Sequence, residues 1–284
     1  MKREFREYQK KNEFLICVDS DGTVMNTMEI KHFGCFGPCL VEEWGLQQYE
    51  ERVLKIWTAV NLYSINRGVN RFVGLQLVLE YINKNITPIE ELDVLARWVR
   101  TTPELSNAAL IRYLEDDLSR IMPKVLHWSQ MVSQHIAMIP VEQRRPYDGV
   151  AEALMAARED CDMVVVSAAN PDAIYEEWEL HGLAYFVDLI LNQNVGSKAF
   201  CISQLLEMGY HPTKVLMIGN AMKDLETAQA CGVCFYPIVL NKETASWQRF
   251  NEEALDRFYD GTYLGAYQDE LIDEFVQALD ANYE

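Results

Sequence analysis

The sequence contains no apolar run long enough to span a bilayer, and it begins with a charged stretch, MKREFREYQKKNE, that does not resemble a secretion signal. Basic residues are also scarce, because 25 Lys and Arg stand against 43 Asp and Glu and give a formal net charge of −18. A surface this acidic repels nucleic-acid phosphates and anionic lipid, so we expect neither a nucleic acid nor a membrane as a partner. An anion-binding site would need cations of its own.

The chain also lacks a paired cysteine pattern. It has seven cysteines, an odd number without regular spacing, and several lie in apolar segments: Cys17, Cys161 and Cys201. This usage is typical of reduced thiols and predicts a cytoplasmic location. His32, Cys35 and Cys39 have a spacing loosely like that of a zinc site, but no fourth ligand stands nearby, so we interpret HFGCFGPC as a packed loop.

Short apolar runs rich in Val, Ile and Leu are present near both ends of the chain, and each has the length of a buried parallel strand. They lie at residues 14–18, 163–167, 186–191, 215–219 and 233–237. The segments between them have helical periodicity, and some end in glycine, as SKAFCISQLLEMG and AMKDLETAQACG do. Strand and helix therefore alternate, which predicts an α/β fold with a Rossmann-like, doubly wound parallel sheet.

The middle of the chain lacks this alternation. Helical patterns follow one another there, and the first, VEEWGLQQYEERVLKIWTAVNLYSINRG, reads as one long amphipathic helix. Stretches rich in Gly and Pro bound the region, FGCFGP at its start and IPVEQRRPYDG at its end, and we expect them to be hinge loops. The sequence thus predicts a core domain, residues 1–24 and 143–284, with an inserted all-helical domain, residues 25–142.

Two aspartates follow the first expected strand. In FLICVDSDGT, Asp19 and Asp21 stand just beyond the carboxyl end of that strand, which is where open parallel sheets bind ligands. One carboxylate can attack phosphorus and form an aspartyl-phosphate, while the other protonates the leaving oxygen and then activates water. Two carboxylates beside a phosphate require a hard divalent cation. DSDGT is equally compatible with a capped turn, so this motif does not decide alone.

Polar side chains also follow the later strands. Ser167 ends MVVVS, and its hydroxyl with the amide of Ala168 suits a phosphoryl oxygen, although a serine bonded to nearby backbone is the simpler alternative. Lys198 in NVGSKAF stands near an expected helix start, where a cation is unfavourable unless it faces an anion. A solvated lysine is the alternative there. Asn220 and Asp224 follow the strand VLMIG, and Asp224 suits either a metal or the helix dipole.

In this order, Asp-x-Asp-Gly-Thr, Ser, Lys and Gly-Asn-x-x-x-Asp resemble the four motifs of the haloacid dehalogenase superfamily, whose members are mostly phosphatases. The resemblance implies that Asp19 is the nucleophile and Asp21 the general acid and base. It implies that Ser167 and Lys198 hold the phosphoryl group, next to Ser20 and Ala168. It also implies that the helical insertion is a cap domain.

The resemblance further implies a magnesium site made by Asp19, the backbone carbonyl of Asp21, and Asn220 or Asp224. Because the dehalogenase and phosphonate-cleaving branches lack an aspartate at position 21, the pattern favours a phosphatase or a phosphomutase. The fourth motif usually begins Gly-Asp, whereas here it is Gly219-Asn220. A neutral amide oxygen is a weaker ligand for a hard cation, which leaves open a protein that binds a phosphometabolite with little turnover.

Substrate contacts are expected from the cap domain. In NLYSINRGVNRF, Arg67 and Arg71 stand beside an apparent helix break, where they suit a carboxylate or a second phosphate of the substrate. A helix-capping loop with solvated arginines is the simpler alternative. Taken as a whole, the sequence predicts a cytoplasmic, magnesium-dependent phosphatase that acts on a small phosphorylated metabolite.

Overall fold

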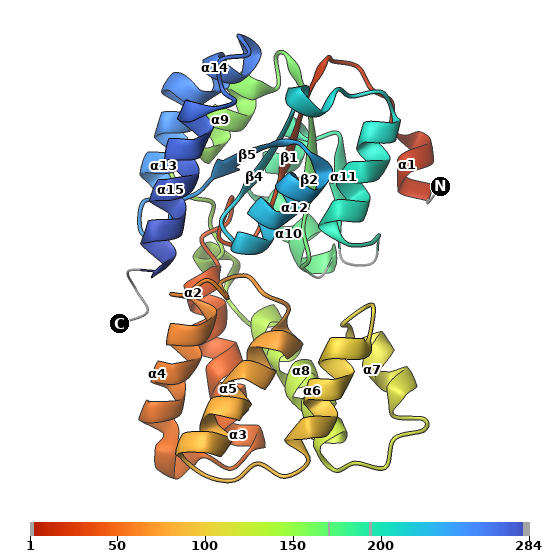
Figure 1. The fold of residues 1–284 in the computed structure, drawn as a ribbon, viewed down its shortest axis with the longest axis vertical. Helices are drawn as coiled ribbons and strands as arrows, with labels where there is room; N and C mark the ends of the chain where they lie inside the picture. The colour runs from red at the N-terminus through yellow and green to blue at the C-terminus, as the bar shows by residue number, and fades with distance from the viewer. Residues whose placement is uncertain (1–2, 170, 193–194, 281–284) are drawn as a thin grey trace. The chain divides into compact units, whose positions relative to one another are not determined.

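The computed structural model describes residues 3–169, 171–192 and 195–280. The chain divides into two compact units, coloured along the chain in Figure 1. The first unit comprises Met1–Thr27 and Pro140–Asn282, and the second comprises Met28–Ile139. The boundaries drawn from the sequence, after residue 24 and before residue 143, each lie three residues from these positions.

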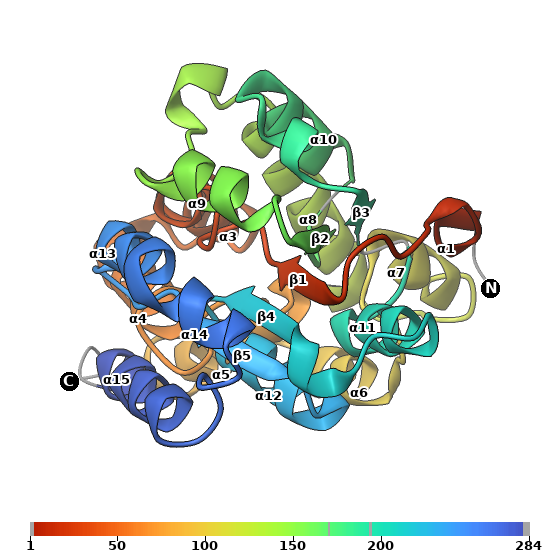
Figure 2. The ribbon, with the colours of Figure 1, turned by 90° about the horizontal axis from the view of Figure 1, so that it is seen from above.

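The first unit is built on a parallel sheet with the strand order β3-β2-β1-β4-β5 (Figure 2). Its strands are β1 (Phe14–Val18), β2 (Cys161–Val166), β3 (Leu189–Leu191), β4 (Val215–Gly219) and β5 (Cys234–Pro237). The central strand β1 pairs in parallel with both β2 and β4. The expected α/β fold with a doubly wound parallel sheet and an inserted helical domain is confirmed.

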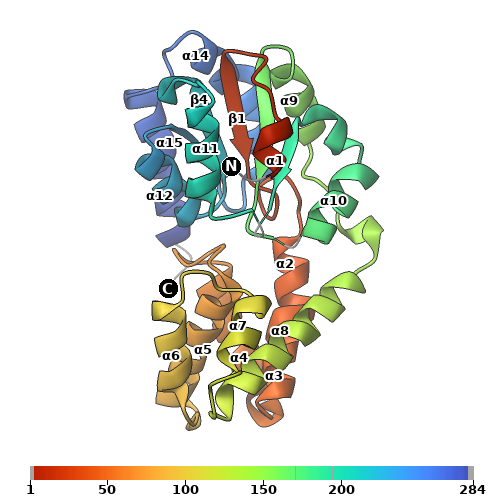
Figure 3. The same cartoon turned by 90° about the vertical axis from the view of Figure 1, so that its right-hand side faces the viewer.

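Helices cover both faces of the sheet, because its strands are apolar on both sides. On one face of the sheet, Ile16 and Val18 of β1 and buried residues of the neighbouring strands form one hydrophobic cluster with residues of four helices. These helices are α9 (Val150–Ala157), α10 (Pro171–Leu180), α13 (Glu243–Arg249) and α14 (Leu255–Tyr259). In Figure 3, α9 and α10 lie on one side of β1, and α11 (Lys198–Glu207) and α12 (Met222–Cys231) lie on the other. Helix α15 (Ala266–Asp280) packs on β5. The short elements of this unit are α1 (Arg3–Glu7), η3 (Val141–Gln143), η4 (Leu183–Phe186), η5 (Pro212–Lys214) and η6 (Phe250–Ala254).

The third strand is shorter than the apolar run 186–191 predicts. Residues Leu183–Phe186 form a 3-10 helix, and the strand starts only at Leu189. The reason is Asp188, whose carboxylate accepts a hydrogen bond from the amide of Met163 and pairs with Arg158. A polar anchor in the middle of the run divides it into a helical turn and a strand.

The second unit is entirely helical within residues 28–139. Its α-helices are α2 (Met28–Lys31), α3 (Gly37–Glu43), α4 (Glu50–Asn61), α5 (Arg71–Asn85), α6 (Leu92–Thr101), α7 (Asn107–Tyr113) and α8 (Ile121–Ala137), with a π-helical turn η1 (His32–Phe36) and a 3-10 turn η2 (Gln47–Tyr49). Buried aromatic rings form its core: Trp57, Phe72, Trp98 and Trp128. None of the helices among the described residues is both long and apolar enough to cross a membrane.

The expectation that FGCFGP forms a hinge loop is wrong, and so is the interpretation of HFGCFGPC as a packed loop. Residues 28–43 run as α2, η1 and α3 without a break in helical structure. Gly37 donates its amide to the carbonyl of His32, a π-type bond, and Pro38 follows in the first turn of α3, where a missing N–H is tolerated. A Cβ atom on Gly37 would stand 2.7 Å from Leu54 Cδ2, so this glycine permits close packing of α3 against α4.

The single long helix expected from residue 41 onward is also wrong. Helix α3 ends at Glu43, and α4 starts at Glu50. Gly45 lies between them with a φ angle of +64°, in the left-handed region that glycine adopts at helix ends. The amphipathic period continues through this turn, which explains why periodicity alone joined the two helices.

Candidate active site

Three charged side chains meet beyond the carboxyl ends of β1 and β4. Lys198 Nζ lies 3.0 Å from Asp19 Oδ1 and 2.5 Å from Asp224 Oδ1. Asp19 follows β1 directly, Lys198 is the first residue of α11, and Asp224 is the third residue of α12. Their side chains are largely buried, with 10, 13 and 0% exposure respectively. The fold thus brings together three of the residues selected from the sequence, and the alternative of a solvated lysine is wrong.

Asp224 reaches this cluster because the end of β4 has no side chain in its way. A Cβ atom on Gly219 would lie 2.4 Å from the Asp224 carboxylate, so only glycine fits there. Asp224 Oδ2 also accepts a hydrogen bond of 3.2 Å from the amide of Ala221 at the start of α12. The Asp224 carboxylate therefore has two roles. Its Oδ2 accepts a hydrogen bond from the start of α12, and its Oδ1 pairs with Lys198.

Burial and charge pairing have opposite effects on the pKa values in this cluster. Burial raises the pKa of Asp19 to about 6, although Lys198 works in the opposite direction. For Lys198, burial disfavours the ammonium, but Asp19 and Asp224 outweigh it and raise the pKa above its ordinary value. The lysine therefore stays charged at neutral pH and supplies the local cation that an anion site in an acidic protein needs.

The loop after β1 is held by many hydrogen bonds. The carbonyl of Ser20 accepts from the amides of Val24 and Met25, both at 2.9 Å, and Asp21 Oδ1 accepts from Thr27 Oγ1 at 2.7 Å. Ser20 itself is fully buried, and its hydroxyl accepts a hydrogen bond from Trp178. The Ser20 hydroxyl is thus already engaged by a residue of the protein. A role of Ser20 in substrate binding stays a prediction.

Ser167 lies at the end of β2, the strand next to β1. Its amide donates to the carbonyl of Leu191, and its hydroxyl accepts from the amide of Ala169 at 3.2 Å. This local bond is the simpler alternative considered from the sequence. Ala168 between them is exposed. Contacts of Ser167 and Ala168 with a phosphoryl group stay a prediction.

Asn220 occupies the place after β4 and is 3% exposed. Its Oδ1 accepts a hydrogen bond of 3.1 Å from Thr23 Oγ1, while its buried Nδ2 has no hydrogen-bond partner. If the amide is turned over, Nδ2 can donate to the Thr23 hydroxyl and the carbonyl oxygen takes the unpaired position. In the sequence, only the place of Thr23 in DSDGT points to this contact.

The donor set suits a hard cation but contains few charges. Among the residues that the structure describes, no three His, Cys, Asp or Glu side chains are placed together as metal ligands. Asp19 offers a carboxylate, Asp21 a backbone carbonyl and Asn220 its amide oxygen, and all of these are oxygen donors of the type that Mg²⁺ takes. Asp224 has both oxygens engaged by Lys198 and Ala221, which leaves Asn220 as the better candidate after β4.

Arg67 and Arg71 belong to the second unit, at the break between α4 and α5. Arg67 is 2% exposed and donates to the carbonyl of Leu62, so the alternative of a solvated side chain is wrong for it. Arg71 donates to Ser129 and Ser133 of α8, and its guanidinium lies 5.3 Å from the ring centre of Phe36. A role of either arginine in substrate binding stays a prediction.

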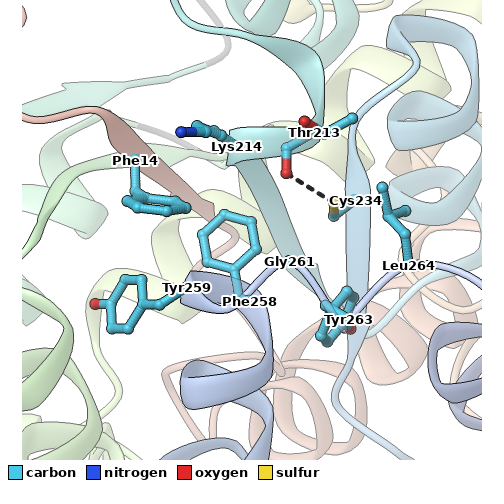
Figure 4. A pocket seen from close by; sticks show the side chains of 9 residues that line it. All are labelled: Phe14, Thr213, Lys214, Cys234, Phe258, Tyr259, Gly261, Tyr263 and Leu264. Carbon is cyan, nitrogen blue, oxygen red and sulfur yellow. Dashed lines mark hydrogen bonds between the residues drawn. The ribbon is translucent and has the colours of Figure 1, made fainter.

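A hollow of about 240 Å³ lies at the amino-terminal ends of the strands, opposite to the ends that Asp19 and Asn220 follow (Figure 4). Phe14, the first residue of β1, lines it together with Lys214 before β4 and Cys234 at the start of β5. Because the strands are parallel, their starts and their ends lie at opposite edges of the sheet, and Asp19 follows the end of β1. The hollow is therefore separate from the cluster around Lys198. Four of its lining residues are aromatic and pack against one another: Phe14, Phe258, Tyr259 and Tyr263.

A sequence model of the haloacid dehalogenase-like hydrolase family matches residues 76–238 of the chain. No curated protein sequence matches it.

Solved structures of low sequence identity share the fold. One is a protein from Lactobacillus delbrueckii subsp. bulgaricus ATCC BAA-365 that is named a phosphoglycolate phosphatase, with a TM-score of 0.54, 12% identity, and coverage of 90% of this chain and 100% of that one. A protein from Bacteroides fragilis that is named a haloacid dehalogenase-like hydrolase has a TM-score of 0.52 and 13% identity, and the match covers 83 and 93% of the two chains. A predicted phosphoglycolate phosphatase from Haemophilus somnus 129pt has a TM-score of 0.50 and 15% identity, with coverage of 80 and 86%.

Proposed function

Because the chain belongs to the family of haloacid dehalogenase-like hydrolases, we propose that it is a cytoplasmic, magnesium-dependent phosphatase of a small phosphorylated metabolite. The observation that carries the proposal is the buried cluster in which Lys198 contacts both Asp19 and Asp224 beyond the ends of β1 and β4. A second carboxylate, Asp21, stands two residues after Asp19. A nucleophile, a fixed cation and an acid–base group are the parts that phosphoryl transfer through a covalent intermediate requires.

In the proposed reaction, an Asp19 carboxylate oxygen attacks phosphorus, and the bond between phosphorus and the leaving oxygen breaks. Asp21 gives its proton to that leaving oxygen. Asp21 then takes a proton from water, whose oxygen attacks the phosphorus of the aspartyl-phosphate and releases inorganic phosphate and the Asp19 carboxylate. Throughout, Lys198 supplies positive charge beside Asp19, in a buried place where that charge acts strongly.

Magnesium would be held by Asp19, the backbone carbonyl of Asp21 and Asn220. When bound, it would supply positive charge toward the phosphoryl oxygens and reduce the repulsion between the phosphate and the two aspartates. With the Asn220 amide turned over, Nδ2 donates to Thr23 and the buried carbonyl oxygen takes the unpaired position, which supports this assignment because a metal there would complete the site.

The direct test is a screen of phosphorylated metabolites with and without Mg²⁺, read by release of inorganic phosphate. Metal-dependent release supports the phosphatase. Movement of a phosphate between two positions of one sugar would indicate a phosphomutase instead. Binding of phosphometabolites without turnover at any magnesium concentration would contradict the enzymatic proposal and favour a binding protein.

Asn220→Asp is expected to lower the magnesium concentration that gives half-maximal phosphate release. Hard cations prefer anionic oxygens, so a carboxylate at this position should tighten metal binding. The measurement is a magnesium titration of phosphate release for both proteins. Thr23→Val is the companion variant, because it removes only the hydroxyl that bonds Asn220. An unchanged titration in Asn220→Asp would remove Asn220 from the metal site.

Arg71→Ala and Arg67→Ala are expected to weaken the reaction with the true substrate while they change hydrolysis of a small generic ester little. A lost charge-assisted contact of about 1.5–3 kcal/mol lowers kcat/KM roughly ten- to a hundred-fold. The control is Arg97→Ala, which removes an exposed arginine of the same unit that pairs with Asp93. Equal loss on both substrates would place these two arginines in folding of the helical unit instead.

A further inference from the structure

Two fully buried tryptophans donate hydrogen bonds to the loop that carries Asp19 and Asp21. Trp178 is in α10, and its indole Nε1 donates to Ser20 Oγ at 2.9 Å. Trp247 is in α13, and its Nε1 donates to the carbonyl oxygen of Thr23 at 2.9 Å. Both indoles have no exposed surface. Because a buried indole N–H is costly to leave unpaired, each ring strongly prefers the position in which its N–H donates to the loop.

The two acceptors stand within the motif DSDGT. Ser20 lies between the two aspartates, and its backbone carbonyl also accepts the amides of residues 23, 24 and 25. Its own amide bonds the Asp19 carboxylate and thereby favours the ionised form of that group. Whatever orients Ser20 therefore orients the Asp19 carboxylate on one side and the Asp21 backbone on the other.

The helices that carry the indoles are remote from the loop in the chain. Trp178 and Ser20 are 158 residues apart, and Trp247 and Thr23 are 224 residues apart. Both rings belong to the same buried cluster on one face of the sheet, where they pack among aliphatic and aromatic side chains. The packed core therefore sets the positions of both rings, and their indole N–H groups are two hydrogen-bond donors held in place beside the loop.

From this geometry we infer that Trp178 and Trp247 are positioning residues for phosphoryl transfer, which hold the loop after β1 so that Asp19 and Asp21 keep their productive orientation. The inference rests on the proposed function. Neither ring touches a reacting atom, since Trp178 acts through Ser20 and Trp247 acts through Thr23. Because a misplacement of about 1 Å in a catalytic group can reduce the rate roughly a hundred-fold, two fixed hydrogen bonds at this place have a large effect on turnover.

The test compares Trp178→Phe, Trp247→Phe and a matched control, Trp128→Phe. Trp128 is also fully buried and also donates its indole N–H to a carbonyl, that of Phe36 in the helical unit. Each variant removes one buried indole donor and leaves an aromatic ring in place. Four quantities are measured for each: stability against chemical denaturation, kcat and KM on 4-nitrophenyl phosphate with Mg²⁺, and hydrogen exchange of the amides of residues 23–25.

We expect all three variants to lose stability, but only Trp178→Phe and Trp247→Phe to lose activity. In those two, kcat should fall about ten- to a hundred-fold with little change in KM, and the amides of residues 23–25 should exchange faster. Ser20→Ala should lower kcat as well, and adding it to Trp178→Phe should lower kcat by less than the product of the two single effects.

The inference is overturned if kcat stays at the native value in both variants, whether or not exchange in the loop increases. It is equally overturned if Trp128→Phe lowers kcat as much as they do, because the effect would then follow stability alone. Absence of phosphate release by the native protein would contradict the proposed function instead. In that case hydrogen exchange still decides whether the indoles hold the loop, and unchanged exchange of residues 23–25 in both variants would overturn that as well.

Discussion

Asp19→Asn is expected to lower phosphate release by at least about four orders of magnitude while the protein stays folded, because an amide cannot form the aspartyl-phosphate. The fold should tolerate the change well. Burial already raises the pKa of Asp19 to about 6, so the folded state disfavours the ionised carboxylate at neutral pH. Lys198 keeps its contact with Asp224 in the variant. Stability of the metal-free protein above pH 6 should therefore be unchanged or higher.

The measurements are single-turnover and steady-state phosphate release together with denaturant unfolding. Asp188→Asn is the matched control, since it changes a buried aspartate of the same unit that bonds Met163 and Arg158, away from the cluster. That variant should lose stability and keep its kcat, whereas Asp19→Asn should do the opposite. Native-like turnover in Asp19→Asn would exclude Asp19 as the nucleophile.

Lys198→Met is expected to remove activity and also to destabilise the protein by about 3–5 kcal/mol, because it leaves two carboxylates buried without their cation. The apolar side chain fills a similar volume, so the loss is mainly electrostatic. Asp224 is fully buried and Asp19 nearly so, and Lys198 is the cation that contacts both. We expect this single change to have the largest effect on stability of those considered.

The destabilisation by Lys198→Met should grow with pH. Without the lysine, the pKa of Asp19 should rise further above the value of about 6 that it has in the native cluster. A carboxyl group whose folded pKa exceeds its unfolded value of about 3.9 is favourable to folding while protonated, and that contribution is lost as the pH rises through the folded pKa. The variant should therefore be closer to the native stability at pH 5 than at pH 8.

The measurement is denaturant unfolding of both proteins at the two pH values in the presence of a chelator. Adding Asp224→Asn to Lys198→Met should recover part of the lost stability, because one buried charge is removed while the amide oxygen can still accept from Ala221. A loss of stability that is the same at pH 5 and pH 8, with no recovery in the double variant, would show that the three side chains do not act as an electrostatic unit.

Much of the core followed from local patterns in the sequence. The strands 14–18 and 215–219 are observed with the predicted bounds, because a short run rich in Val, Ile and Leu with turn residues after it is typical of a strand buried in a parallel sheet. Lys198 stood out because a cation at a helix start breaks a local rule, and such violations are concentrated at sites where an unseen partner compensates. Asp19 and Asp224 were selected for a different reason, their place beyond the end of a strand, where open parallel sheets bind ligands.

Glycine and proline misled the prediction where packing, and not a turn, required them. In FGCFGP, Gly37 lets two helices approach closely and Pro38 follows a π-type turn, so the residues that usually mark a loop lie inside helical structure. Asp188 shows the reverse. It carries no glycine or proline signal for a break, yet the hydrogen bond that it accepts from Met163 divides the apolar run that was predicted to be one strand. Local statistics cannot separate these cases, since the deciding contact comes from another segment.

By itself, the sequence determined the fold class, the ends of the main strands and the identity of the charged groups beyond them, because these depend on short-range periodicity and residue chemistry. The tertiary structure alone decided which groups meet. It placed Lys198 between Asp19 and Asp224, turned the Thr23 hydroxyl toward Asn220, and brought Trp178 to the loop after β1. These contacts join segments 26 to 197 residues apart, and they form only when the packed core fixes their separation.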